Sequence, residues 1–180
     1  AQLGLLIFMT PIAAISAMLV APMFGAAMGR AALPLAVLLM ALAFVLPGQA
    51  SVWWLFPLAM ACAGAATGLT DVLMNARVAA IETQRGLHLM NLAHAAYSFG
   101  YAGGAVLTGV LRGAGWEPDW VMGTMAAVGV ACAALTIERD GRIDGLRKPK
   151  DGTALPLGLV PVIGGGIVLI AFMTENAAEN

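Results

Sequence analysis

Gly68-Leu-Thr-Asp71-Val-Leu-Met-Asn75 places a carboxylate and an amide inside a strongly apolar run of the chain. A second stretch, Asn91-Leu-Ala-His94-Ala-Ala-Tyr97-Ser98-Phe-Gly100, repeats this pattern with an amide and an imidazole. Ionisable groups at membrane depth are costly, so by default they face a polar cavity or a partner and mark a functional path. The composition of the chain decides whether these runs are membrane segments.

The composition is that of a membrane protein. Hydrophobic residues make up 61% of the chain and charged residues only 11%, whereas ordinary soluble domains carry about 25% charge. A soluble fold of this size cannot bury so much apolar surface, so the lipid bilayer is the expected solvent and partner. Ala, Leu and Met are abundant and no run alternates with period two, which favours helical spans over a β-barrel. The net charge of -1 gives no electrostatic case for nucleic acid.

Six hydrophobic segments have about the 20 residues that a membrane span requires. We therefore expect an all-α, polytopic transmembrane helix bundle of about six spans, with a charged cytoplasmic linker at 138–154 between two membrane bundles. Residues 1–137 then supply five helices of an N-terminal bundle, and 155–180 supply the first helix of a C-terminal one. The chain begins without Met, directly before an apolar run, so we expect it to be part of a longer protein whose further transmembrane helices are partners. The expected spans are 3–28, 31–46, 52–79, 89–111, 120–137 and 155–174.

The basic residues predict the orientation of the spans. Of the nine Lys and Arg residues, only Arg112 lies in the loops of one side, which leaves eight on the other. Because cytoplasmic loops carry the excess of Lys and Arg, the loops 80–88 and 138–154 are expected to be cytoplasmic. This orientation suits a plasma membrane or a bacterial inner membrane. Near the opposite ends of the spans lie four residues typical of an interface belt, Trp53, Trp54, Trp116 and Trp120.

The third expected span carries one continuous helix face of special composition. Gly64, Gly68, Asp71 and Asn75 fall at i, i+4, i+7 and i+11, so a small-residue contact stripe continues into an acid and an amide. Removal from water disfavours the charged form of a carboxyl group, which suits Asp71 to carry a proton. The alternative is a structural pair between Asp71 and a neighbouring cation, Arg77 or His94.

The fourth expected span carries a second polar face. Asn91, His94, Ser98 and Tyr101 fall at i, i+3, i+7 and i+10, and Tyr97 lies beside them. Two successive antiparallel helices with one polar face each are expected to line a shared cavity. Their side chains offer both hydrogen-bond donors and acceptors, which suits a polar solute, although an internal structural network is the alternative. The candidate substrate-binding residues are Asn75, Asn91, His94, Tyr97 and Ser98.

The remaining chemistry-bearing residues give weaker indications. Glu175, after the last span, is a candidate second cavity acid or a simple helix-end carboxylate. Arg77 and Glu82 are expected to form a gate or a surface ion pair near the cytoplasmic end. The two cysteines, Cys62 and Cys132, lie in apolar runs and are expected to be buried small hydrophobic residues. No metal site and no cofactor other than the coupling proton is expected.

An enzyme is the weaker class of interpretation. Ser98 and His94 share a helix face, and a hydroxyl nucleophile beside its base is the minimum that covalent catalysis needs. No nucleophile motif or pair of metal ligands accompanies these two residues. The sequence therefore predicts a protein that is not an enzyme.

These stretches resemble the major facilitator superfamily, and more narrowly its branch containing the fucose:proton symporter. That branch carries an acid and an asparagine four residues apart late in its fourth helix, matched by Asp71 and Asn75. Its fifth helix opens with Asn-Leu-Ala-Gln and continues to Ser-Phe-Gly, matched by Asn91-Leu-Ala-His94 and Ser98-Phe-Gly100. The match covers Gly68 to Gly104, and elsewhere only the topology agrees. His94 stands where the family has glutamine, and Asp71 where it has glutamate.

The resemblance implies that the chain spans the second to seventh helices of a twelve-helix transporter. It also implies proton coupling at Asp71 and substrate contact at His94. We therefore expect a secondary active transporter that takes up a small polar solute such as a sugar by alternating access. The alternatives are proton-coupled efflux of small amphipathic compounds and a non-transporting membrane sensor on the same fold. Neither the identity of the substrate nor the direction of transport follows from the sequence.

Overall fold

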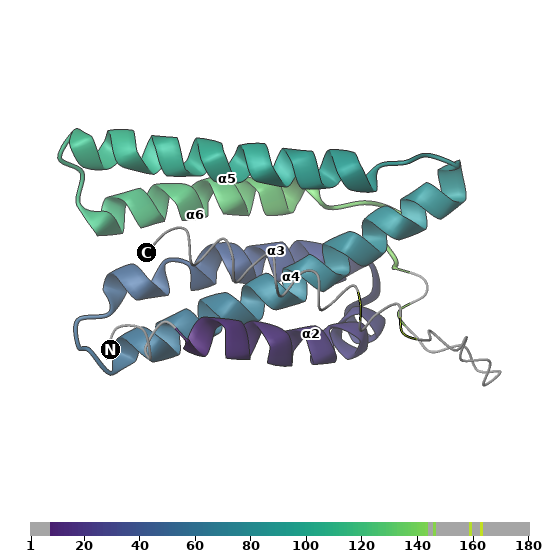
Figure 1. Ribbon diagram of the computed structural model, residues 1–180, viewed down its shortest axis with the longest axis horizontal. Helices are drawn as coiled ribbons and strands as arrows, with labels where there is room; N and C mark the ends of the chain where they lie inside the picture. The colour runs from purple at the N-terminus through teal and green to yellow at the C-terminus, as the bar shows by residue number, and fades with distance from the viewer. Residues whose placement is uncertain (1–7, 144–145, 147–158, 160–162, 164–180) are drawn as a thin grey trace. The chain divides into compact units, whose positions relative to one another are not determined.

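The computed structural model describes residues 8–143, 146, 159 and 163 of the chain (Figure 1). Contacts group the chain into two compact units, Ala1–Lys148 and Pro149–Asn180, and all helices discussed below belong to the first unit. The expected last span, 155–174, lies outside the described residues except for Leu159 and Ile163. The domain boundaries expected from the sequence therefore stay a prediction.

The described part of the chain is helical and contains no strand. Its helices alternate in direction, so that each one returns along the bundle beside its predecessors (Figure 1). Two short 3-10 turns, η1 (Gly29–Ala31) and η2 (Leu46–Gln49), flank the second helix of the series. The α-helices are α2 (Met9–Met28), α3 (Ala32–Ala43), α4 (Leu55–Arg85), α5 (Met90–Gly113) and α6 (Pro118–Leu135).

Glycine and proline set several of the helix ends. Gly29 and Gly86 follow α2 and α4 with φ of 58° and 64°, a left-handed region that favours glycine. The backbone N–H of Gly86 donates to the carbonyl oxygen of Glu82 at 2.8 Å and completes the last turn of α4. Pro118 is the first residue of α6. A backbone N–H at this position has no partner within the helix, so proline costs no hydrogen bond there. Pro22 lies inside α2, as membrane helices tolerate.

Three helical stretches in the described residues are long and apolar enough to cross a membrane. They are Met9–Gln49, α4 and α6. The first of them reverses direction at Gly29 and contains both α2 and α3. The chain thus has the helices of an α-helical membrane protein. Because polar residues and glycines lower its mean hydropathy, α5 does not belong to this set. The expected number of six spans stays a prediction.

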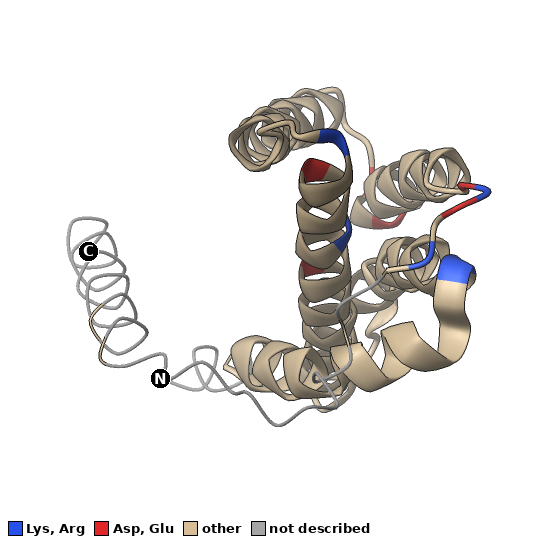
Figure 2. Ribbon diagram, turned by 90° about the vertical axis from the view of Figure 1, so that its right-hand side faces the viewer, with Lys and Arg blue, Asp and Glu red and all other residues tan. Residues whose placement is uncertain are grey.

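Charged and aromatic residues gather at opposite ends of the first unit. The α2–α3 turn, the α4–α5 loop and the segment after α6 lie together at one end, which Figure 2 views directly. That end carries five of the six described arginines, whereas the α3–α4 and α5–α6 connections and the first turn of α6, at the other end, carry the four tryptophans. This is the arrangement expected of spans anchored at both faces of a bilayer. The arginines are Arg30, Arg77, Arg85, Arg139 and Arg142.

The most extensive contact between two of the described helices is that of α4 with α2. A Cβ atom at Gly64 would lie 2.2 Å from the carbonyl oxygen of Thr10, and one at Gly68 would lie 2.3 Å from that of Ala14. Only glycine permits this approach of two backbones, as the small-residue stripe predicts. On the other side, α4 and α6 both contact α3 or its turns. The core cluster consists of Ala32, Ala36, Leu73 and Ile143.

Candidate functional site

Asp71 and Asn75 form a hydrogen-bonded pair on α4. The amide nitrogen Nδ2 of Asn75 donates to Oδ1 of Asp71 at 3.1 Å. Both residues are half-buried, and they follow Gly68 along the helix. In an isolated helix, an i, i+4 pair of this kind adds about 0.2–0.5 kcal/mol to stability. The structure therefore brings together the acid and the first amide that the sequence selects.

The other polar atom of this amide has no hydrogen-bond partner among the described residues. Oδ1 of Asn75 is buried and accepts no hydrogen bond from the described residues. A buried acceptor without a donor costs about 1–3 kcal/mol, and such an atom commonly awaits a water molecule or a ligand. The Asp71–Asn75 pair thus combines a half-buried carboxyl group with a buried carbonyl oxygen that still lacks a donor among the described residues.

The four candidate residues of α5 lie on an open surface. Asn91, His94, Tyr97 and Ser98 are all exposed, and no residue of α5 is buried. The hydroxyl group of Ser98 donates to the backbone carbonyl oxygen of His94 at 3.0 Å, so it does not contact the imidazole as a nucleophile would. The rings of Tyr97 and Tyr101 stack with centroids 6.5 Å apart. These residues form a continuous polar and aromatic face.

The polar faces of α4 and α5 do not meet in the structure. The two helices share a loop and then diverge, with few contacts between them (Figure 1, Figure 2). No hydrogen bond joins Asp71 or Asn75 to the polar residues of α5 within the described part of the chain. The shared cavity expected from the sequence is therefore not formed by these two helices alone. Glu175, the second candidate acid, lies outside the described residues.

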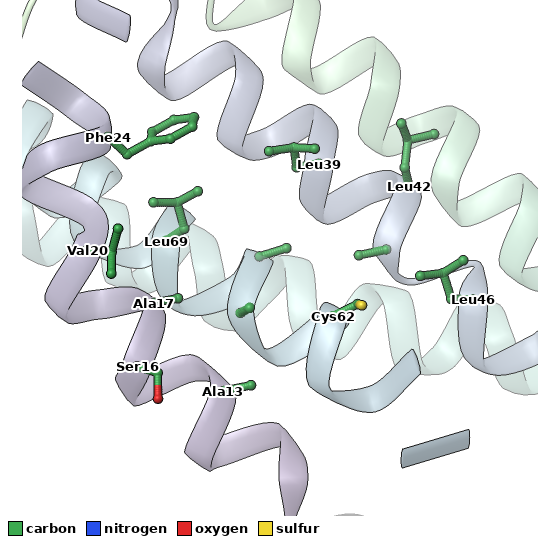
Figure 3. A pocket seen from close by; sticks show the side chains of 13 residues that line it. Ala13, Ser16, Ala17, Val20, Phe24, Leu39, Leu42, Leu46, Cys62 and Leu69 are labelled. Atoms are coloured by element: carbon green, nitrogen blue, oxygen red, sulfur yellow. The ribbon is translucent and has the colours of Figure 1, made fainter. Parts of the chain in front are cut away.

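A cavity of about 770 Å3 lies elsewhere, between α2, α3 and α4 (Figure 3). Its walls are alanine, leucine, valine and phenylalanine side chains, and its polar members are Ser16 and Cys62. The hydroxyl group of Ser16 is already used, because it donates to the carbonyl oxygen of Ile12 at 2.8 Å. This cavity suits hydrocarbon and not a polar solute, and none of the candidate site residues lines it.

Arg77 is the most strongly engaged charged residue of the described chain. Only 8% of the residue is exposed, and its Nε donates to Oε2 of Glu138 at 3.0 Å, while Nη2 forms a salt bridge with the same oxygen. Its Nη1 donates to the backbone carbonyl oxygen of Arg142 at 3.3 Å. The sequence indicated an ion pair for Arg77, but its partner lies 61 residues away, and no local pattern reveals it.

Glu82 has a different role from the gate or ion pair expected of it. Its Oε1 accepts hydrogen bonds from the backbone N–H groups of Leu89 and Met90, the second at 2.7 Å. These N–H groups belong to the start of α5, where the first turn lacks internal partners and the helix dipole favours an anion. Glu82 therefore caps α5 and fixes the α4–α5 loop.

Both cysteines are free and exposed, which contradicts the expectation that they are buried. The apolar runs around Cys62 and Cys132 cannot distinguish a buried position from one that faces lipid, because both surroundings are apolar. Among the described residues no group of three His, Cys, Asp or Glu side chains is placed to hold a metal ion.

Comparison of the chain with protein-family models, with curated proteins and with solved structures finds no match.

Proposed function

We propose that this chain belongs to a proton-coupled secondary transporter, in which Asp71 carries the coupling proton. The observation that carries the proposal is the Asp71–Asn75 pair on α4, with its buried, unpartnered Asn75 Oδ1. A carboxylate in a helix of this hydropathy is costly unless it serves a polar path, and the free carbonyl oxygen beside it supplies a place for a donor.

The proposed coupling follows from the chemistry of this pair. An ionised Asp71 accepts the Nδ2–H of Asn75, whereas a protonated Asp71 is neutral and has one O–H donor of its own. Protonation removes a charge from the membrane interior, and a neutral, loaded carrier then reorients at lower cost than a charged one. Two bundles that rock around a midplane site provide the reorientation.

The solute is proposed to be small and polar, such as a sugar. Its hydroxyl groups would donate to Oδ1 of Asn75 and contact the polar face of α5, where Asn91, His94, Tyr97 and Ser98 supply donors, acceptors and an aromatic surface. Because these α5 residues are exposed, other helices of the same protein are proposed to complete the site. Efflux of amphipathic compounds and a non-transporting sensor remain the alternative functions on this fold.

Proton flux in liposomes tests the proposal. We would reconstitute the protein with a pH-sensing dye and add a panel of deoxy- and hexose sugars, then amphipathic drugs. We expect a sugar-evoked proton movement in the direction of the sugar, and we expect Asp71→Asn to abolish it because the amide cannot carry a proton. Asp119→Asn is the matched control, since Asp119 is an exposed acid in the first turn of α6, and this variant is expected to keep the flux.

The other outcomes separate the alternatives. Proton movement that opposes a drug gradient would reassign the protein to efflux. Ligand binding without any flux would favour the sensor. Unchanged flux in Asp71→Asn would contradict the role of Asp71 and leave its hydrogen bond to Asn75 as a purely structural contact.

A further inference from the structure

The segment that follows α6 lies against the charged end of the bundle. Ile143 is only 6% exposed and belongs to the core cluster with Ala32, Ala36 and Leu73. Leu146 packs against the same cluster. The sequence pattern of this region is that of a charged linker, so its apolar anchors in the core are unexpected.

Two glycines leave room for this contact. A Cβ atom at Gly25 of α2 would lie 2.3 Å from Cδ1 of Leu146 and 2.9 Å from Cδ2 of Leu73. A Cβ atom at Gly141 would lie 3.2 Å from the backbone carbonyl oxygen of Arg30, in the turn between α2 and α3. The segment therefore meets α2 at a position without a side chain, and it approaches the η1 turn with a glycine of its own.

The segment also forms polar contacts with α4. Glu138 pairs with the buried Arg77 of α4, and the backbone carbonyl oxygen of Arg142 accepts from the same guanidinium group. A buried arginine without a counter-charge is strongly destabilising, so Arg77 favours the docked segment. The side chain of Glu138 is 43% exposed, which leaves its carboxylate open to competition from water.

Few interactions nevertheless hold this segment to the helices. Residues 138–143 form no helix or strand, and no hydrogen bond between backbone groups joins them to the helices within the described residues. Elements held by a few side chains open locally at lower free energy than packed helices do. We propose that Glu138–Ile143 and Leu146 form a releasable latch, which holds the end of α6 to α2, α3 and α4 when docked and frees Arg77 when open.

The latch acts on the turn of α4 that carries the Asp71–Asn75 pair. Leu73, which lies between these two residues in sequence, is fully buried within the cluster that receives Ile143. Docking and release of the latch therefore change the packing of this turn. The inference stands on these contacts and does not depend on the proposed transport activity.

Cysteine labelling tests the latch without any transport measurement. In the full chain with Cys62→Ala and Cys132→Ala, Ile143→Cys reports docking, and Gln84→Cys is the control because Gln84 is exposed near the end of α4, outside the apolar part of the helix. We expect a polar maleimide to label position 143 far more slowly than position 84. Adding Glu138→Gln is expected to raise the rate at 143 about tenfold or more, the factor that corresponds to 1.4 kcal/mol. The charge exchange Arg77→Glu with Glu138→Arg is expected to return the rate toward that of the parent.

Two results would overturn the latch. The first is equal labelling at positions 143 and 84 in the parent, because the segment would then not be docked. The second is an unchanged rate at 143 in Glu138→Gln, because the ion pair would then not hold the segment. If Glu138→Gln fails to fold, Glu138→Asp, which keeps the carboxylate on a shorter side chain, is measured instead. A faster rate in this variant supports the latch, and an unchanged rate contradicts it.

Discussion

Helices α4 and α5 both carry a polar face through an apolar sequence, yet their surroundings differ completely. In α4, the glycines of that face contact the backbone of α2, and residues such as Leu73 and Arg77 are buried. In α5, no residue is buried, and Gly100, Gly103 and Gly104 have open space where a Cβ atom would lie. The sequence of a helix determines which of its residues lie on one face. Whether that face is buried depends on the helices that pack around it.

The largest expected difference between the two helices concerns their leucines. Leu73 of α4 is fully buried, and Leu73→Ala is expected to lower the free energy of unfolding by about 2–5 kcal/mol, since it leaves a void in the core cluster. Leu107 of α5 is 44% exposed, and Leu107→Ala is expected to change that free energy by about 0.5 kcal/mol or less. Unfolding in mixed micelles, followed by circular dichroism, measures both. Equal losses in the two variants would mean that α5 packs as tightly as α4.

Substitution of glycine is expected to have smaller effects, which are opposite in sign in the two helices. Gly68→Ala places a methyl group 2.3 Å from the carbonyl oxygen of Ala14, so α2 and α4 must separate at a cost of about 1–3 kcal/mol. Gly104→Ala meets no atom within 4 Å and is expected to stabilise the chain by up to about 1 kcal/mol through helix propensity. The same unfolding measurement compares them. A stabilised Gly68→Ala variant would contradict the close contact between α2 and α4.

The sequence predicts local features of the fold better than tertiary ones. The span expected at 3–28 ends where α2 ends, and the span expected at 120–137 begins two residues after the start of α6 at Pro118. The span expected at 31–46 is a helix of only 12 residues, Ala32–Ala43, because the chain turns again at η2 around Pro47. The span expected at 52–79 continues to Arg85 because Gly86, and not the last apolar residue, ends α4.

For the site too, the sequence predicts contacts within one helix better than contacts between distant segments. The helical spacing of Asp71 and Asn75 predicts their contact, since residues four apart are neighbours on a helix. The pairing of Arg77 with Glu138 and the burial of Ile143 depend on residues far apart in the sequence. No periodicity or charge pattern encodes such contacts, and in a membrane protein an apolar side chain suits both lipid and core.

The central proposal is that the polar faces of α4 and α5, which do not meet in the structure, border one water-filled path that other helices of the same protein complete. Thiol accessibility tests it most directly, in the protein with Cys62→Ala and Cys132→Ala, reconstituted in lipid and treated with a charged, membrane-impermeant thiol reagent. We predict that Asn75→Cys and His94→Cys react, whereas Phe99→Cys, at an 81% exposed and apolar position of α5, stays protected by lipid. Protection of both Asn75→Cys and His94→Cys would contradict the claim and leave the two polar faces as structural contacts within the membrane.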